Sequence, residues 1–140
     1  MSGIVPSVDE IASVAEFRAA LRAFLRRSER IARQCGLTPQ RYLLLLMIKG
    51  AKDGSEQSTV TELAERLQLA QSTVTELVRR AEEAGLLARE QSSKDGRVAH
   101  LRLTEEGERR LLSSFTELGT ERRQLRDAFA HISDFGASAV

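Results

Sequence analysis

Hydrophobic residues recur every three to four positions along most of the chain, which is the period of amphipathic helices. The longest such stretch covers residues 9–34, and its apolar positions are Val14, Phe17, Leu21, Phe24, Leu25 and Ile31. A helix of that length, about 40 Å at 1.5 Å per residue, is too long to be covered by the core of a small domain. The pattern therefore predicts a long N-terminal helix whose apolar face needs a partner.

A second stretch, residues 43–48, is apolar on nearly every side. Thr38 and Pro39 precede it, and they suit the N-cap and the first position of a helix. We therefore predict a buried central helix that ends near Gly50. The polar, turn-rich residues 52–58 predict a loop after it.

Two short helices joined by a tight turn are predicted next. Thr59 and Glu62 have the spacing of a capping box, which marks the start of the first helix. The second helix begins in AQSTVTELVRR, residues 70–80, and it continues until Gly85 ends it. Its predicted buried face consists of Val74, Leu77, Val78 and Ala81. Two such helices form a helix-turn-helix.

The hydrophobic period changes from helical to alternating over residues 86–104. Two alternating stretches flank SSKDG, which supplies turn residues, so the segment predicts a β-hairpin that forms a wing. Thr104 then caps a last long helix, with Gly119 as a point at which it can bend. One face of that helix is predicted to carry Leu111, Leu112, Phe115, Leu118, Leu125 and Phe129. The fold class is therefore mainly α with a small β-hairpin wing.

Composition narrows the classes of function. The chain has 140 residues and a net charge of +1, so its totals do not indicate a nucleic-acid binder. The single cysteine, Cys35, excludes an internal disulfide and suits a reducing cytoplasm. No stretch approaches the roughly 20 apolar residues of a membrane span. We expect a cytoplasmic protein that has no membrane partner.

The chain has few residues that could form a catalytic or metal-binding site. Its two histidines and one cysteine are too scattered for a zinc site or an activated nucleophile, and no glycine-rich phosphate loop is present. We therefore expect no enzymatic activity, no catalytic residues, no metal and no cofactor.

The second helix of the helix-turn-helix has an unusual outer face. Gln71, Ser72, Thr73 and Thr75 occupy its first turns, although hydroxylated residues are mediocre helix formers. Ser and Thr can bond base edges or phosphates in a DNA major groove, and arginine can bind guanine. The alternative is that Ser72 or Thr73 only caps the helix. The outward-facing candidates for DNA contact are Gln71, Ser72, Thr73, Thr75, Glu76 and Arg79, of which Glu76 is equally explained as a solvated carboxylate.

Residues 58–111 resemble the winged helix-turn-helix of the MarR family of bacterial transcriptional regulators, and GLTPQRYLLLLMI resembles that family's second helix. The most specific pieces are LAQSTVTELVRRAEEAGLL, the wing tip Asp95-Gly96-Arg97, and LTEEG. The resemblance implies a homodimer built by the terminal helices. It implies N-terminal and C-terminal dimerisation helices in residues 1–37 and 105–140, and a DNA-binding lobe in residues 38–104.

Individual roles also follow from the resemblance. It implies that Arg97 enters the minor groove and that Asp95 holds its guanidinium, whereas an ordinary turn is the alternative. Lys94 is a candidate phosphate contact. Tyr42 is a weak candidate to line a pocket for a small aromatic or phenolic effector, although its apolar neighbours suit a core. Gln68 departs from the glycine of many members, and a positive φ there would cost about 1 kcal/mol.

The function implied by the resemblance is a sequence-specific regulator, a repressor that binds double-stranded DNA as a homodimer on a pseudo-palindromic operator. Two alternatives stay open. One is a winged-helix module that binds protein instead of DNA, which the near-neutral charge of residues 59–103 supports. The other is a thiol-based redox sensor that uses Cys35.

Overall fold

The computed structural model describes residues 5–91 and 96–137, and the chain divides into two compact units. The winged-helix unit is Ile31–Phe115, and the terminal-helix unit combines Met1–Arg30 with Thr116–Val140. In the described part of the chain, none of the helices is both long enough and apolar enough to cross a membrane.

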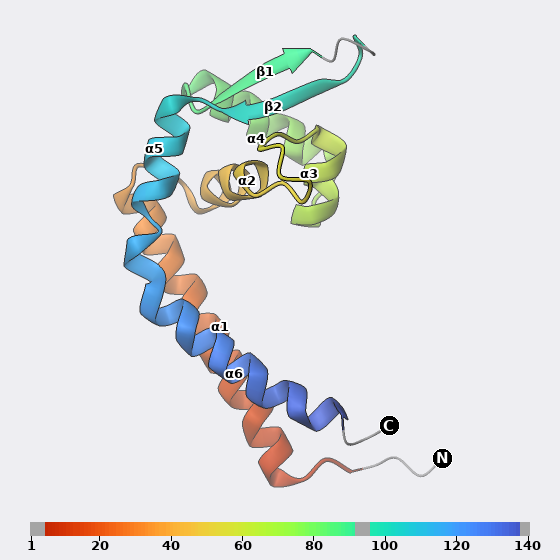
Figure 1. Ribbon diagram of the computed structural model, residues 1–140, viewed down its shortest axis with the longest axis vertical. Coiled ribbons are helices and arrows are strands. Elements are labelled where there is room, and N and C mark those ends of the chain that lie inside the picture. The colour runs from red at the N-terminus through yellow and green to blue at the C-terminus, as the bar shows by residue number, and fades with distance from the viewer. Residues whose placement is uncertain (1–4, 92–95, 138–140) are drawn as a thin grey trace. The chain divides into compact units, whose positions relative to one another are not determined.

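The winged-helix unit contains four helices besides the last residues of α1 and a two-stranded antiparallel sheet (Figure 1). Its elements are α2 (Pro39–Lys49), α3 (Val60–Leu67), α4 (Gln71–Glu83), β1 (Leu87–Gln91), β2 (Ala99–Leu103) and α5 (Glu105–Ser113). This order confirms the predicted helix-turn-helix with its wing, and it confirms the mainly helical fold class.

Local signals start and stop these helices as predicted. The Thr38 hydroxyl accepts a hydrogen bond from the Arg41 backbone amide at 3.1 Å, with Pro39 in the first turn. Thr59 and Glu62 form both bonds of a capping box at the start of α3. Gln68 ends α3 in the left-handed region, at φ 56°, and its side-chain amide donates to the Glu65 carbonyl at 2.7 Å. That bond gives a partner to one of the backbone carbonyls that have no hydrogen-bond donor at the end of a helix.

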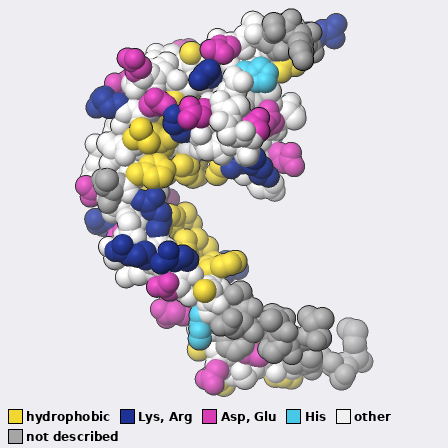
Figure 2. Space-filling model, viewed as in Figure 1, with side chains coloured by type: hydrophobic (Ala, Val, Ile, Leu, Met, Phe, Trp, Pro, Cys, Tyr) yellow, Lys and Arg dark blue, Asp and Glu magenta, His cyan; other side chains and the backbone are white. Residues whose placement is uncertain are grey.

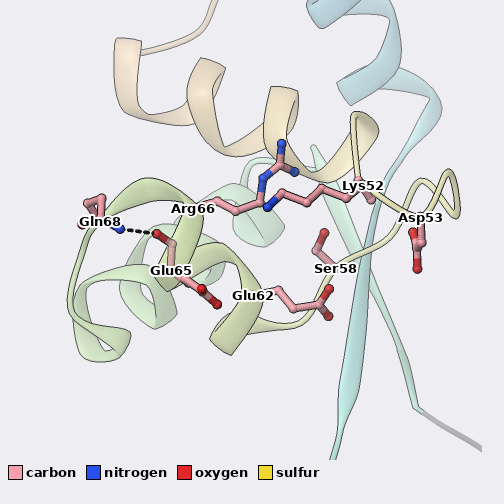
Figure 3. A pocket seen from close by; sticks show the side chains of 8 residues that line it. Lys52, Asp53, Ser58, Glu62, Glu65, Arg66 and Gln68 are labelled. Carbon is pink, nitrogen blue, oxygen red and sulfur yellow. Dashed lines mark hydrogen bonds between the residues drawn. The ribbon is translucent and has the colours of Figure 1, made fainter. Parts of the chain in front are cut away.

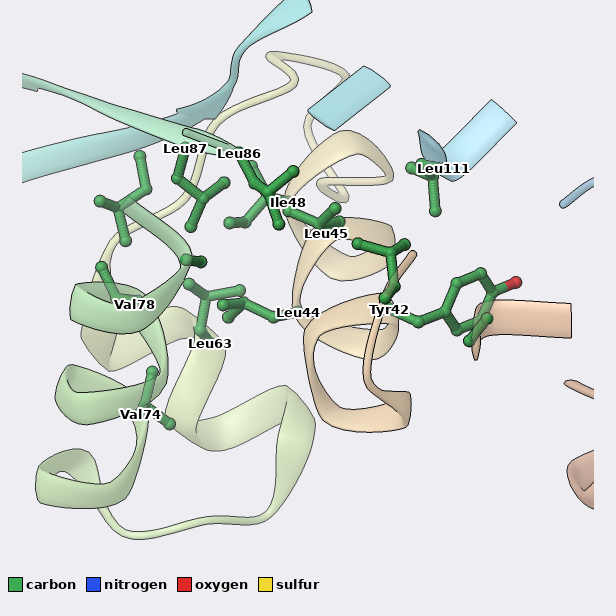
Figure 4. Close-up of a cluster of buried hydrophobic side chains, with 14 of the residues drawn as sticks. Tyr42, Leu44, Leu45, Ile48, Leu63, Val74, Val78, Leu86, Leu87 and Leu111 are labelled. Atoms are coloured by element: carbon green, nitrogen blue, oxygen red, sulfur yellow. The ribbon is translucent and has the colours of Figure 1, made fainter. Parts of the chain in front are cut away.

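One hydrophobic core holds the winged-helix unit together (Figure 4). Its fully buried large side chains come from α2, α3, α4, the hairpin and α5, and they include Leu44, Leu45, Ile48, Leu63, Val74, Val78, Leu86, Leu101 and Leu111. In the stretch of α2 predicted to be buried, Leu44, Leu45 and Ile48 are fully buried, whereas Leu46 and Met47 are partly buried and Leu43 is 40% exposed. The core therefore contacts only one face of α4.

The hairpin is attached to the unit at its base. Leu87 pairs with Leu103 across the two strands, and Gln91 pairs with Ala99 toward the tip. The backbone of Ser58 exchanges two hydrogen bonds with that of Leu101, at 3.1 and 2.8 Å, which ties β2 to the segment before α3. In β1 only Leu87 is buried, so the outer part of the strand extends from the core into solvent.

The prediction of one continuous helix after Thr104 is wrong. The chain forms α5, then a short 3-10 turn at Thr116–Leu118, and then α6 (Gly119–Ala137). At the end of α5, the hydroxyls of Ser113 and Ser114 donate to the carbonyls of Arg110 and Leu111, at 2.9 and 2.6 Å. Serine side chains compete in this way for the acceptors that would continue a helix.

The terminal-helix unit pairs most of α1 (Val8–Gln34) with α6. The rings of Phe17 and Phe129 lie 5.9 Å apart between centroids, and Arg27 Nε lies 3.5 Å from Glu121 Oε1. Several large apolar side chains of this unit are nonetheless exposed, and they include Val8, Ile11, Val14, Leu25 and Phe129. Part of the predicted apolar face is thus uncovered within the chain.

Candidate nucleic-acid interface

Helix α4 is anchored by one face and open on the other. Val74, Val78 and Ala81 are fully buried, whereas the predicted contact residues Gln71, Ser72, Thr73, Thr75 and Arg79 are exposed and Glu76 is half-buried. The N-cap of α4 is Ala70, and no side chain caps the helix. Ser72 and Thr73 therefore do not act as caps, so the alternative explanation for their hydroxyls is wrong.

The start of α4 is also tied to the preceding helix. Gln71 Nε2 donates to Thr61 Oγ1 on α3 at 3.3 Å, between two exposed side chains. Beside it, Ser72, Thr73 and Glu76 help to line a shallow hollow of about 380 Å³, which Gln40 of α2 borders. The outer face of α4 is therefore a contoured polar surface and not a flat one.

Charged side chains form a network along α4. Glu76 accepts from Arg79 Nε and Nη2 at 2.9 and 2.6 Å, and from Arg80 Nε at 3.0 Å. Glu83 pairs with Arg79 from the following turn. Arg80 was not among the predicted contact residues, although its spacing of four residues from Glu76 was the available signal. Exposed pairs of this kind contribute little to stability, so Arg79 can leave them for another partner at low cost.

The network shifts the ionisation of its members. Hydrogen bonds from Arg79, with a smaller contribution from Arg80, lower the pKa of Glu76 to about 2. The hydrogen bond and charge of Glu76 raise the pKa of Arg79 in turn. Both side chains therefore stay ionised at neutral pH, and the outer face of α4 carries alternating charges.

This shift predicts a pH effect on stability. Because the folded pKa of Glu76 lies below its ordinary 4.5, its contribution is complete above pH 4.5 and is lost as the pH falls toward 2. We expect the thermal midpoint of the wild type to exceed that of Glu76→Gln at about pH 6, and the gap to shrink by about pH 3. Added salt should also narrow the gap at pH 6. A gap that is constant with pH would contradict the assignment.

Of the DNA-contact residues predicted in the wing, one lies within the residues that the structure describes. Arg97 is exposed and follows Gly96 at the hairpin tip. Lys94 and Asp95 lie outside the described residues, so the predicted bond between Asp95 and Arg97 stays a prediction. Arg89 on β1 donates to Glu82 of α4 at 2.9 Å, which links the wing to that helix.

Charges of both signs lie on the visible face of the winged-helix unit (Figure 2). Figure 2 shows acidic and basic side chains interspersed over the visible face of the winged-helix unit, without a broad basic surface. Attraction to a polyanion would therefore depend on a few local cations. The outer face of α4 and the wing tip supply Arg79, Arg80 and Arg97.

Two residues singled out for other roles lie inside the winged-helix unit. Tyr42 is only 7% exposed and belongs to the hydrophobic core, so its effector role stays a prediction. Cys35 is half-buried, and its sulfur lies 3.2 Å from the hydroxyl oxygen of Ser113.

A polar depression of about 420 Å³ lies beside α3 (Figure 3). Its side chains already serve local structure. Arg66 Nη1 donates to the carbonyls of Met47 and Gly50 at the end of α2, at 3.0 and 3.2 Å, and Glu62 belongs to the capping box. Asp53 accepts from Ser55 in the loop. The depression is explained by these contacts, and we do not include it in the interface.

The sequence model of the MarR family matches residues 36–98. A MarR family protein from Bacillus stearothermophilus has a similar structure, with a TM-score of 0.66, 28% identity, and coverage of 88% of this chain and 81% of that one. No match was found among the curated proteins.

Two further solved structures share the fold. AbsC, a MarR family transcriptional regulator from Streptomyces coelicolor, has a TM-score of 0.68 at 21% identity, covering 89% of this chain and 84% of that one. A mutant MarR from E. coli, complexed with operator DNA, has a TM-score of 0.68 at 17% identity, covering 88% of this chain and 89% of that one.

Proposed function

We propose that the chain is a winged-helix transcriptional regulator of the MarR family, a repressor that binds a pseudo-palindromic operator as a homodimer. The observation that carries the proposal is the outer face of α4. Its hydroxyls are exposed and do not cap the helix, although residues of this type weaken a helix slightly. Contact with DNA accounts for that choice of residues.

In this proposal α4 is the recognition helix, which enters the major groove. Ser72 and Thr75 bond base edges or phosphates, while Gln71 and Thr73 contact the backbone near the N-terminus of the helix. Arg79 leaves Glu83 to reach a guanine, and Glu76 either accepts from a cytosine or keeps Arg79 aligned. Two copies of the helix then read half-sites about one helical turn apart.

The wing completes each half-site. Arg97 inserts into the minor groove, whose negative potential favours arginine, and Asp95 orients its guanidinium. Lys94 binds a phosphate beside it. These three assignments rest on the family resemblance, and for Arg97 also on its exposure beside the hairpin tip.

The terminal-helix unit supports the dimer. Val8, Ile11, Val14 and Leu25 of α1 are exposed, and a second copy of the chain would remove them from water. A small aromatic or phenolic effector would release the DNA only if it prefers a spacing of the two lobes that does not fit the operator.

The test is DNA binding at two salt concentrations, using fragments from the region that flanks the chain's own gene. We expect affinity to fall by about 10³-fold between about 50 and 200 mM salt, since phosphate contacts release counterions. Arg97→Ala should weaken binding by about tenfold and reduce the salt slope by about one. Arg109, an exposed arginine of α5, provides the matched control, and Arg109→Ala should bind as the wild type does.

Binding that is indifferent to both salt and Arg97→Ala would contradict the proposal. A winged-helix module that binds protein would then be the better explanation. Footprinting of the same fragments locates the operator, and protection of two half-sites about one turn apart is the expected result.

A further inference from the structure

One carboxylate on the outer face of α4 binds two arginines. Glu76 Oε2 accepts from Arg79 Nε at 2.9 Å, and Glu76 Oε1 accepts from Arg79 Nη2 at 2.6 Å and from Arg80 Nε at 3.0 Å. The two bonds from Arg79 are the parallel pair with which a guanidinium binds a carboxylate or a phosphate. Glu76 therefore occupies the edge of Arg79 that would otherwise bind a phosphate.

The other end of the Arg79 guanidinium has a different partner. Arg79 Nη1 pairs with Glu83, one turn further along α4. A guanidinium has five N–H donors, so the Nη1 end can leave Glu83 for a guanine while Nε and Nη2 stay on Glu76. Recognition of a guanine therefore does not require the bonds to Glu76 to break, whereas binding of a phosphate along the edge formed by Nε and Nη2 does.

The balance of charge on α4 increases the importance of these bonds. The helix contains three glutamates and two arginines, a net charge of −1, although it is the proposed recognition helix. Arg79 and Arg80 are two of the three described arginines that the outer face of α4 and the wing tip supply. Glu76 thus contacts most of the positive charge that this surface offers to a polyanion.

Binding to unrelated DNA depends on phosphate contacts, because the phosphates are the same in every sequence. If Arg79 or Arg80 moved to a phosphate, one anionic partner would replace another, with little gain in affinity. The Glu76 carboxylate would also stay beside the polyanion, where like charges repel. Hydrogen bonds from the two arginines lower the pKa of Glu76 to about 2, so this repulsion is present throughout the neutral range.

We propose that Glu76 determines specificity by keeping Arg79 and Arg80 off the phosphates of unrelated DNA. This inference rests on the proposed function and adds to it, because it gives Glu76 a part in rejecting DNA that lacks the operator. At the operator, the hydroxyls of α4 and the Nη1 end of Arg79 contact bases, and Glu76 opposes these contacts little. The ratio of the two affinities therefore depends on Glu76.

The test compares the full-length wild type with Glu76→Gln on a random-sequence duplex, by fluorescence anisotropy over a series of salt concentrations. We expect Glu76→Gln to bind this duplex about tenfold more tightly at about 100 mM salt. The slope of log affinity against log salt should steepen by about one to two, since each arginine that reaches a phosphate releases about 0.9 counterion. Affinity for the operator should rise less, so that the ratio of operator to random affinities falls.

Glu65→Gln is the matched control, because it removes an equal charge from the same unit. Glu65 is exposed on α3, and it has no ion pair with any residue that the structure describes. Its replacement should leave the salt slope unchanged and alter the affinity by less than about twofold.

Arg80→Gln separates a direct effect on the arginines from a general change of charge. In a chain that already carries Arg80→Gln, the further change Glu76→Gln can free only Arg79. The salt slope should then steepen by about one less than it does when Arg80 is present. A general change of charge would have the same effect in both backgrounds.

Three results would overturn the inference. They are no gain of Glu76→Gln on the random duplex, equal effects of Glu76→Gln and Glu65→Gln, or an equal change of slope with and without Arg80. The random duplex contains no operator, so a wild type that does not prefer the operator would contradict the proposed function without altering these comparisons. Retained operator recognition with no gain on the random duplex would remove only the role of Glu76.

Discussion

Replacement of Gly107 by alanine is expected to lower the free energy of unfolding by about 3 kcal/mol. A Cβ at this position would lie 2.3 Å from the Leu86 carbonyl oxygen and 3.2 Å from its carbonyl carbon. That carbonyl cannot easily move, because it accepts a hydrogen bond from the Thr104 amide at 3.0 Å. Gly107 thus allows α5 to pass close to the chain segment that leads into the wing.

Urea denaturation followed by circular dichroism measures this effect. Gly119→Ala is the control, because a Cβ there meets nothing within 4 Å. Alanine is also the better helix former, so the control should be neutral or slightly more stable. If Gly107→Ala unfolds at the same urea concentration as the wild type, the close approach of α5 to Leu86 is not a feature of the folded chain.

Much of the fold could be predicted because its signals are local. Thr38 with Pro39, and Thr59 with Glu62, start their helices through contacts within four residues, so a sequence pattern contains all the information. The alternation that predicts the hairpin is equally local. The buried face of α4 followed from its period, and the exposed positions of Ser72 and Thr75 followed from the same period.

Features that depend on competition between partners could not be predicted. Ser113 and Ser114 end α5 because their hydroxyls take acceptors that a continuous helix would need, and helix periodicity gives no measure of that competition. Arg79 was expected to face DNA, but its pairing with both Glu76 and Glu83 depends on rotamers.

The largest expected effect on DNA binding comes from Thr75→Asp. Thr75 is exposed on the outer face of α4, one turn after the start of the helix. The change removes a hydroxyl and a methyl contact and places a carboxylate against a polyanion, where like charges cost several kcal/mol. We expect affinity for the operator to fall by more than about 100-fold. Aspartate and threonine have similar helix propensities, so stability should change little.

Fluorescence anisotropy with the footprinted fragment, at one fixed salt concentration, measures the loss for Thr75→Asp. Thr120→Asp makes the same chemical change in the first turns of α6, on an exposed residue outside the interface, and should bind as the wild type does. Circular dichroism and urea denaturation show whether both variants remain folded. If the two folded variants bind DNA equally well, the hydroxyl-rich face of α4 does not lie against the duplex. The slight weakening of that helix by its serine and threonines would then need a protein partner to explain it.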